Sequence, residues 1–198
     1  MNDLGPAHVL PRDVECGGER LAFRLMQAAD VDAVLGFARA LPEHDLLFLR
    51  RDITHPKVVE AWARELEGGS LTSILAVAGD RVVGCATVVR DPLSWSPHVA
   101  ELRIVLGEEM RGRGLGALLT QEAFALALAA GSEKIFAQMT VDQKGAIAIF
   151  EGLGFSPEAM LRDHVRDRSG RSYDLVVLSH DVARVNARHA AYGLDEAF

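Results

Sequence analysis

Residues 109–118, EMRGRGLGAL, constrain the fold of this chain most, because they place three glycines at alternate positions beside two arginines. Glycine is less favourable than alanine inside a helix by about 1 kcal/mol, so these glycines do not serve a helical turn. A β-rich run, HVAELRIVL at 98–106, precedes them, and apolar residues at helical spacing follow from about 114. We therefore expect a strand, an exposed glycine loop and a helix N-terminus in succession. The first N–H groups of a helix have no partner within it, so such a junction is typical of an anion site.

The composition argues against several other classes of protein. A chain of 198 residues with 49% hydrophobic and 25% charged residues is typical of one globular domain, and its net charge of -7 disfavours a nucleic-acid partner. Cys16 and Cys85 are too few for a disulfide framework and have no zinc spacing, and the scattered histidines predict no metal site. The N-terminus lacks a signal-peptide pattern and no apolar stretch has membrane-spanning length. We expect a cytoplasmic protein without a membrane partner.

Periodicity predicts helices and strands around one sheet. Strands are expected at 21–25, in two runs around Gly79-Asp80 that signal a hairpin, and at 98–106, 134–141, 157–165 and 173–179. Helices are expected from Asp30 to about Ala40, over 57–69, from about 114 to 130, and over 145–154. We divide the chain into a flexible N-terminal tail at 1–18, one domain at 19–180 and a C-terminal helical extension at 181–198.

Two other readings of the glycine loop stay open at this point. It could be a flexible loop with solvated arginines. Alternatively, Gly112, Gly114 and Ala117 match the dinucleotide pattern G-x-G-x-x-A. That motif belongs in the first βαβ unit of a parallel fold, whereas a strand meander precedes it here, and no acidic residue follows the next strand before Asp142.

The stretch ELRIVLGEEMRGRGLGALL resembles the acyl-CoA signature of the GCN5-related N-acetyltransferases (GNAT), matching its [R/Q]-x-x-G-x-[G/A] pattern at Arg111, Gly114 and Gly116. QKGAIAIFEGLGF, residues 143–155, resembles the second signature of that family. The resemblance covers roughly 20–180. It implies a mixed α/β (α+β) fold, with a central, mostly antiparallel β-sheet that splays open between its fourth and fifth strands and is flanked by helices. Acetyl-CoA would be the co-substrate, with its pantetheine arm in the cleft and its pyrophosphate on the glycine loop.

The resemblance also implies which residues bind acetyl-CoA. They are Ile104, Val105 and Leu106 on the strand, Arg111, Gly112, Arg113, Gly114, Leu115, Gly116 and Ala117 at the loop and helix start, and Gln143, Ala146 and Phe150 in the second signature. The family often has Asn where this chain has Gln143, and Tyr where it has Phe150. That tyrosine is usually taken as the acid that protonates the departing thiolate, and Phe150 cannot donate a proton. A thiol of pKa about 8.5 leaves tolerably as an anion, so we expect slower or water-assisted transfer, with Phe150 lining the cleft or packing in the core.

The acceptor amine needs a base, because an amine of pKa about 10.4 is charged at pH 7 and deprotonating it costs about 4.6 kcal/mol. Glu101 is the first candidate, since the family frequently uses a carboxylate on this strand. Strand alternation puts Glu101 on one face with Arg103 and Val105, where it could instead pair with a neighbouring arginine. His98 is the second candidate and Asp142, which could also cap the following helix, is the third.

Two loops of mixed charge should wall the acceptor groove in such a fold, LPEHDLLFLRRD at 41–52 and RDHVRDRSGRSYD at 162–174. Carboxylates would suit an amine and arginines would suit an amino acid, so a protein lysine, a small amine and an amino-acid derivative all stay open. The sequence thus predicts an acyl-CoA-dependent N-acyltransferase that moves an acetyl group to a primary amine. The alternative is a non-catalytic acyl-CoA sensor, and a homodimer remains open.

Overall fold

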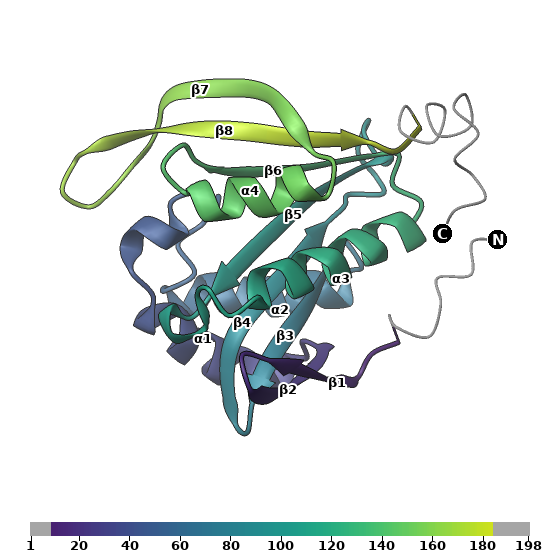
Figure 1. Ribbon diagram of the computed structural model, residues 1–198, viewed down its shortest axis with the longest axis vertical. Coiled ribbons are helices and arrows are strands. Elements are labelled where there is room, and N and C mark those ends of the chain that lie inside the picture. Colours follow the sequence, from purple (N-terminus) through teal and green to yellow (C-terminus); the bar gives the residue numbers. More distant parts are fainter. Residues whose placement is uncertain (1–8, 184–198) are drawn as a thin grey trace.

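One eight-stranded sheet organises the molecule (Figure 1). The computed structural model describes residues 9–183. The strands are β1 Arg12–Cys16, β2 Glu19–Leu25, β3 Leu71–Ala78, β4 Arg81–Val89, β5 Val99–Leu106, β6 Lys134–Thr140, β7 Ser156–Arg166 and β8 Ser172–Asp181. They lie in the order β1-β2-β3-β4-β5-β6-β8-β7, and every neighbouring pair is antiparallel except β5–β6. The prediction of a mostly antiparallel mixed sheet is confirmed.

Helices cover both faces of this sheet, as Figure 1 shows. They are α1 Val31–Ala40, α2 Pro56–Glu67, α3 Leu115–Ala129 and α4 Lys144–Gly152, with short 3-10 segments η2 Ala28–Asp30, η3 Glu43–Leu46 and η4 Glu108–Met110. α1 and α2 bury residues such as Phe37 and Val59 against one face, and α3 and α4 bury residues such as Leu119 and Phe150 against the other. We call these the α1/α2 face and the α3/α4 face. Within residues 9–183, no helix is long and apolar enough to cross a membrane.

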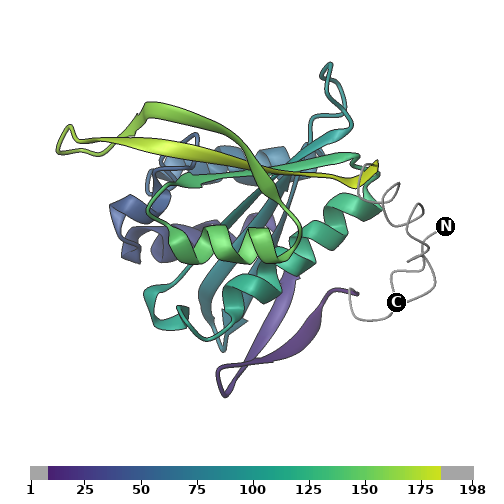
Figure 2. The same ribbon diagram turned by 45° about the horizontal axis from the view of Figure 1, so that its top comes forward.

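The N-terminal prediction was wrong for part of the expected tail. Residues Arg12–Cys16 form β1, which pairs with β2 from Arg12↔Phe23 to Cys16↔Glu19. Gly17 and Gly18, at φ 58° and 79°, form the two-residue turn of this hairpin, for which left-handed glycines are preferred. Figure 2 shows the hairpin at the sheet edge beside α3, to which an Arg12–Glu122 ion pair of 2.5 Å ties it. The predicted helical extension at 181–198 lies outside the described residues, except for its first three positions.

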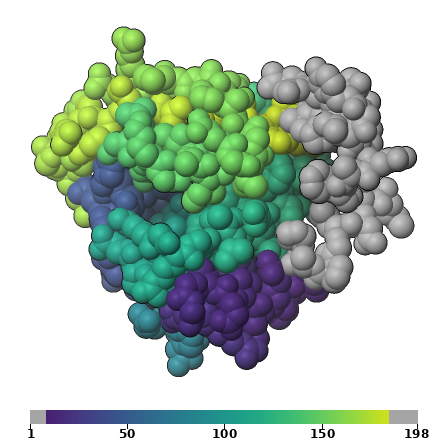
Figure 3. Space-filling view, in the orientation of Figure 1, coloured from purple at the N-terminus to yellow at the C-terminus, as the bar shows by residue number. Residues whose placement is uncertain are grey.

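The sheet divides between β5 and β6. Their parallel pairing runs from Val99↔Lys134 to Leu102↔Ala137, although β5 continues to Leu106 and β6 to Thr140. Beyond the last pair, β5 stays bonded to β4 and β6 stays bonded to β8. The predicted splay is therefore present, between residues 103–106 and 138–140. In the space-filling view the surface is hollowed between α4 and the segment that begins α3 (Figure 3).

Candidate active site

The opening between β5 and β6 has apolar edges. In the unpaired half of β5, Ile104 and Leu106 are half-buried beside the α3/α4 core, and Val105 is buried in the α1/α2 core. The three residues that the sequence assigned to the acyl-CoA arm thus lie where β5 has separated from β6.

The glycine loop, residues 111–116, follows this opening directly. Gly112 has φ 70° and Gly114, the N-cap of α3, has φ 95°, a region that side chains other than glycine rarely adopt. Both are exposed, and a Cβ built on either would meet nothing within 4 Å. The space in front of the loop is therefore open, and the partnerless N–H groups of the first turn of α3 border it. Such backbone suits an anion.

Gly116 has another role than the sequence indicated. It is buried, and a Cβ there would lie 3.0 Å from Ile149 Cδ1 and 3.1 Å from Leu106 Cδ1. The missing side chain at Gly116 therefore lets α3 pack closely on α4 and β5, and it does not open space for a phosphate. The Leu115 side chain is fully buried in the same core, while Ala117 is half-buried in the first turn.

Both arginines of the loop are half-exposed and have carboxylate partners. Arg111 forms an ion pair with Asp45 of η3, and its Nη1 lies 3.6 Å from Glu108 Oε1. Arg113 Nη1 lies 3.9 Å from Glu19 Oε2 at the β1–β2 turn. An anion on the loop would lie near two guanidinium groups, and to bind it each arginine would release its present carboxylate partner.

The second signature supplies less ligand surface than the sequence indicated. Gln143 Oε1 accepts a hydrogen bond of 3.1 Å from Thr140 N, which fixes the turn into α4. Ala146 is half-buried on α4. Phe150 is 4% exposed, and its ring meets Phe155 edge-to-face at 5.0 Å between centroids. Of the two interpretations of Phe150, core packing is the one that its contacts support.

Glu101 is a buried carboxylate held by arginines. It is 4% exposed, and it accepts hydrogen bonds from Arg103 Nε at 3.0 Å and Arg103 Nη2 at 2.7 Å. Arg50 Nη2 lies 3.6 Å from its Oε2. The predicted common face of Glu101, Arg103 and Val105 is confirmed by their register on the α1/α2 face, and the pairing with arginine was also foreseen. Glu101 is buried in this pair, and Arg103 is half-buried.

The two weaker base candidates lie apart. His98 is exposed at the start of β5, where its carbonyl accepts hydrogen bonds from Glu133 N and Lys134 N, so it belongs to the closed end of the strand pair. Asp142 lies at the open end, with its Oδ2 2.9 Å from His44 Nε2. Burial alone would raise the pKa of Asp142, but hydrogen bonds from Thr140, the backbone and His44 lower it. Asp142 does not cap α4, whose N-cap is Gln143.

The family can be assigned from this geometry together with sequence comparison. The profile of the "Acetyltransferase (GNAT) family" matches residues 39–155, which is more than half of the chain. The chain belongs to the GNAT family of acetyltransferases.

A curated protein and many solved structures are similar to this GNAT. "Putative phosphinothricin acetyltransferase YwnH" of Bacillus subtilis (strain 168) is 32% identical over 84 residues, 42% of this chain and 51% of that protein, so the match spans about half of its length. A GNAT acetyltransferase of Streptococcus pneumoniae superposes with a TM-score of 0.70 at 19% identity, covering 81% of this chain and 98% of that one. A phosphinothricin acetyltransferase of Sinorhizobium meliloti in complex with AcCoA gives 0.69 at 20% identity, covering 81% and 87%. At these identities the structures establish the fold.

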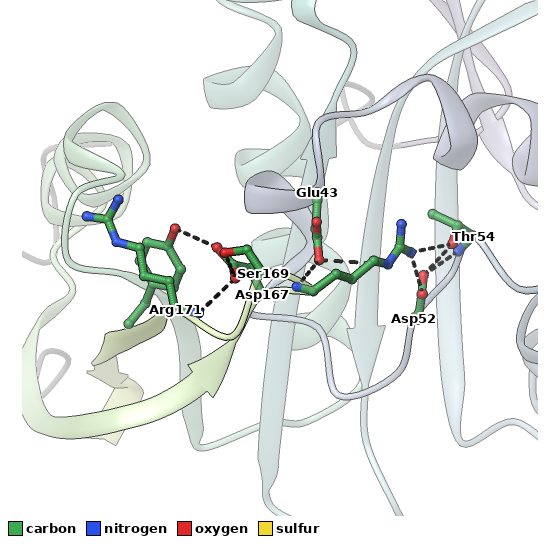
Figure 4. A network of polar contacts seen from close by, with 8 residues as sticks. Glu43, Asp52, Thr54, Asp167, Ser169 and Arg171 are labelled. Carbon is green, nitrogen blue, oxygen red and sulfur yellow. Dashed lines mark hydrogen bonds and ion pairs between the residues drawn. The ribbon is translucent and has the colours of Figure 1, made fainter.

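The two loops that the sequence assigned to the acceptor groove of this GNAT meet each other (Figure 4). The Arg168 N–H donates to Glu43 Oε1 at 2.7 Å, and Arg168 Nη2 donates to Asp52 Oδ2 at 2.8 Å. At the hairpin tip, Asp167 accepts hydrogen bonds from Ser169, the Arg171 N–H and the Tyr173 hydroxyl. These bonds, led by that from Ser169, lower the pKa of Asp167 to about 2. The loops thus form one wall at the open end of β6.

His44 of η3 was missed as a site residue. Its Nε2 lies 3.4 Å from Thr140 Oγ1, and its ring lies 4.9 Å from that of Tyr173, between centroids. The only signal in the sequence was its position in the loop expected to wall the acceptor groove. Its proximity to β6 depends on contacts across about a hundred residues.

A pocket of about 240 Å³ lies on the α1/α2 face of this GNAT. α2 and the segment after α1 form its outer wall, and β3, β4 and β5 form its floor, which includes Arg103. We call it the α2 pocket. Burial raises the pKa of the Cys85 thiol, which lines it, to about 12, so this thiol stays neutral and does not suit an acyl-cysteine intermediate. Among residues 9–183, no group of three potential His, Cys, Asp or Glu metal ligands occurs.

Proposed function

We propose that this GNAT transfers an acetyl group from acetyl-CoA directly to a primary amine. The observation that carries the proposal is the end of β5–β6 pairing after Leu102, with the glycine loop following at the same end of the sheet. An opening that exposes the edge of β5 can hold an extended chain such as pantetheine, and the loop can hold its pyrophosphate. Relatives named as acetyl-CoA complexes, including one from Salmonella typhimurium, share the fold.

In this proposal the binding residues fall into two groups. Gly112, Gly114 and the N–H groups at the start of α3 bind the pyrophosphate, with Arg111 and Arg113 neutralising its charge. Ile104, Leu106 and Ala146 offer apolar surface to the pantetheine arm. Phe150 supports this site from the core.

The reaction forms a C–N bond between the amine nitrogen and the acetyl carbonyl carbon and breaks the C–S bond of the thioester. The amine loses a proton and CoA leaves as a thiolate. We assign the amine proton to Glu101, directly or through water. Its two oxygens accept bonds from Arg103, but a carboxylate offers about four lone-pair sites, so acceptor capacity remains. The thiolate takes a proton from solvent, because Phe150 carries no donor.

Calorimetry with acetyl-CoA tests the binding half of this proposal. We expect micromolar-scale affinity in the wild type and loss of binding in Gly114→Glu, whose side chain fills the anion site. Gly131→Glu is the matched control, because Gly131 also has a positive φ of 78°, has nothing within 4 Å of a Cβ, and follows the other end of α3. Equal binding by Gly114→Glu and wild type would overturn the assignment.

Thiol release tests the transfer half. Free CoA should appear only when acetyl-CoA and an acceptable amine are both present. Acetyl-CoA binding without release for any amine in a broad panel would replace this proposal with the acyl-CoA sensor.

A further inference from the structure

The α2 pocket borders the opening in which the proposed function places the thioester. Its floor includes Arg103, which is the first β5 residue beyond the last pair with β6. Val105, two residues further along the unpaired edge, also lines it. A molecule in this pocket can therefore present one end to the edge of β5 from the face opposite to α3.

The body of the pocket is apolar. Val58 and Trp62 of α2 and Leu49 and Ile53 of the segment after α1 wall it. Its volume of about 240 Å³ lies below the range of about 300–1,000 Å³ typical of drug-sized ligands. It suits one amino-acid-sized molecule with an apolar body.

One polar row crosses the floor toward Arg103. In register across β3, β4 and β5 lie Ser73, Thr87 and Arg103. The Ser73 and Thr87 hydroxyls are 2.9 Å apart, and Trp62 Nε1 donates to Ser73 Oγ at 2.9 Å. These bonds join the wall of the pocket to its floor. Arg103, at the β5 end of the row, is its one charged member.

That end is cationic. Three arginines line the pocket, namely Arg50, Arg51 and Arg103, and none of its lining residues is acidic. Arg51 donates to Glu65 at 2.7 Å, outside the pocket. Within residues 9–183, Glu101 is the one carboxylate that pairs with Arg50 and Arg103, so these two arginines carry one positive charge more than their partner offsets.

The two arginines are bound to Glu101 with different strength. Arg103 is held through Nε and Nη2, and within residues 9–183 its Nη1 has no hydrogen-bond partner. Arg50 reaches Glu101 only at 3.6 Å, beyond hydrogen-bond distance, and its side chain is 64% exposed. A second carboxylate could take Arg50 and the free Nη1 of Arg103 without breaking the bidentate pair.

We infer that the acceptor is a small primary amine that carries a carboxylate and an apolar body, as an apolar α-amino acid does. This inference rests on the proposed function. The apolar body fills the α2 pocket, the carboxylate binds Arg50 and Arg103, and the adjacent amine lies at the unpaired edge of β5, next to Glu101. A lysine within a protein chain has no carboxylate on the amine-bearing end and would leave this charge unmatched.

Two matched series of acceptors test the inference. One is L-leucine, L-leucinamide and 3-methylbutylamine, and the other is L-phenylalanine, L-phenylalaninamide and 2-phenylethylamine. We expect the carboxylate member of at least one series to have a kcat/KM higher by about tenfold or more, the usual contribution of one charge-assisted hydrogen bond. The amine of an amide is the weaker base and is more often uncharged at neutral pH, which works against the expected result.

The variant Arg50→Gln identifies the residue responsible. It should reduce the preference for the carboxylate member, measured as the ratio of its kcat/KM to that of the amide, by about tenfold. Arg64→Gln is the control, since it removes the same charge from the exposed side of α2, outside the pocket lining. Acetyl-CoA affinity should not change in either variant.

Calorimetry with the CoA-bound protein keeps this inference separate from the proposed function. If all amines are acetylated without a carboxylate preference, the acceptor inference is overturned and the proposed function stands. If nothing is acetylated but L-leucine or L-phenylalanine binds in a manner that depends on Arg50, the site is supported and the transferase proposal fails. If neither turnover nor binding favours a carboxylate, the inference is overturned.

Discussion

The glycine loop and the α2 pocket both present arginines to a proposed anion, but they are built in different ways. The loop is one contiguous stretch, 111–116, in which backbone conformation makes the site and a Cβ at Gly112 or Gly114 would meet open space. The pocket draws its lining from residues 49 to 105, on a helix, a loop and three strands, and side chains make the site. The proposed cofactor site therefore depends on local sequence, and the proposed acceptor site depends on tertiary contacts.

This difference has a physical reason. A pyrophosphate is bound by N–H groups that any helix N-terminus offers, so only the absence of side chains has to be specified. An acceptor is distinguished by its shape and charge, which must be matched by side chains brought together from distant segments. We expect substitutions in the two regions to separate acetyl-CoA affinity from turnover.

The largest effect on turnover alone is expected for Glu101→Gln. If Glu101 takes the amine proton, turnover should fall at least tenfold at neutral pH, while acetyl-CoA affinity stays nearly unchanged. The loss should shrink as the pH rises and the amine deprotonates by itself. Initial rates across pH measure the loss of turnover, and calorimetry measures the affinity for acetyl-CoA.

Glu60→Gln, an exposed carboxylate of α2, is the control for charge. A loss of equal size at every pH would show that Glu101 acts by holding Arg103 in place and not as the base. A simultaneous loss of acetyl-CoA affinity would contradict the separation of the two regions.

The sequence predicted most of the fold because its elements are locally encoded. The hairpin at Gly79-Asp80 and the helix capped near Asp30 need only turn residues and periodicity, and both were found. β1 was missed because RDVEC is short and flanked by proline and glycine, and its stability comes from pairing with β2 and from the Arg12–Glu122 ion pair.

The site was predicted unevenly for the same reason. Gly112 and Gly114 could be read from a motif, but the close packing of Gly116 on Ile149 depends on how α3 meets α4. That Glu101 pairs with arginine was foreseen, whereas its burial, and the role of Arg50, depend on the segment after α1 folding over the sheet. Charge runs in the sequence did not show which arginine faces a pocket.

The β1–β2 turn tests whether the glycine loop depends only on local sequence, because residues of this turn contact the loop from a distant part of the chain. A Cβ at Gly17 would lie 2.8 Å from both Cβ and Cδ of Arg113, and Cys16 Sγ donates to the Arg113 carbonyl at 3.3 Å. Gly17→Ala should therefore displace Arg113 and weaken acetyl-CoA binding by about tenfold, the contribution of one charge-assisted contact.

Gly18→Ala separates this clash from backbone strain. Gly18 also has a positive φ, and a Cβ there would meet nothing within 4 Å. Calorimetry should show an affinity near that of the wild type for Gly18→Ala. Equal weakening by the two variants would attribute the effect to the turn conformation and leave the glycine loop self-contained.

A smaller effect is expected at Asp45 of η3, which contacts the glycine loop from a distant part of the chain. Asp45 pairs with Arg111 and competes with an anion on the glycine loop. Asp45→Asn should tighten acetyl-CoA binding by about threefold at low salt, because an exposed ion pair contributes about 0–1 kcal/mol. Asp32→Asn, an exposed carboxylate of α1, should not change the affinity. Weaker binding by Asp45→Asn would mean that Asp45 orients Arg111 for the ligand.

The smallest effect concerns acid stability, which should distinguish the acceptor wall from the glycine loop. Asp167 has a pKa of about 2 in the folded protein against an ordinary 3.8, because it accepts hydrogen bonds from Ser169, the Arg171 N–H and Tyr173. A carboxyl group whose pKa is lowered by folding stabilises the folded state above its unfolded pKa. That contribution is lost as the pH falls from about 4 to about 2. The conformation of Gly112 and Gly114, by contrast, does not depend on a carboxyl group of their own.

Asp167→Asn should therefore lower the thermal unfolding midpoint slightly at pH 7 and flatten its fall between about pH 4 and pH 2. Asp167 is only half-buried at the hairpin tip, so solvent screens its interactions and the shift should be a few degrees or less. Thermal unfolding of both proteins across this range is the measurement, with Asp32→Asn as the control for loss of a surface carboxylate. If wild type and Asp167→Asn lose stability in parallel below pH 4, the bonds at the hairpin tip do not stabilise the wall. The two loops would then be held by contacts between them, such as those of Arg168 with Glu43 and Asp52.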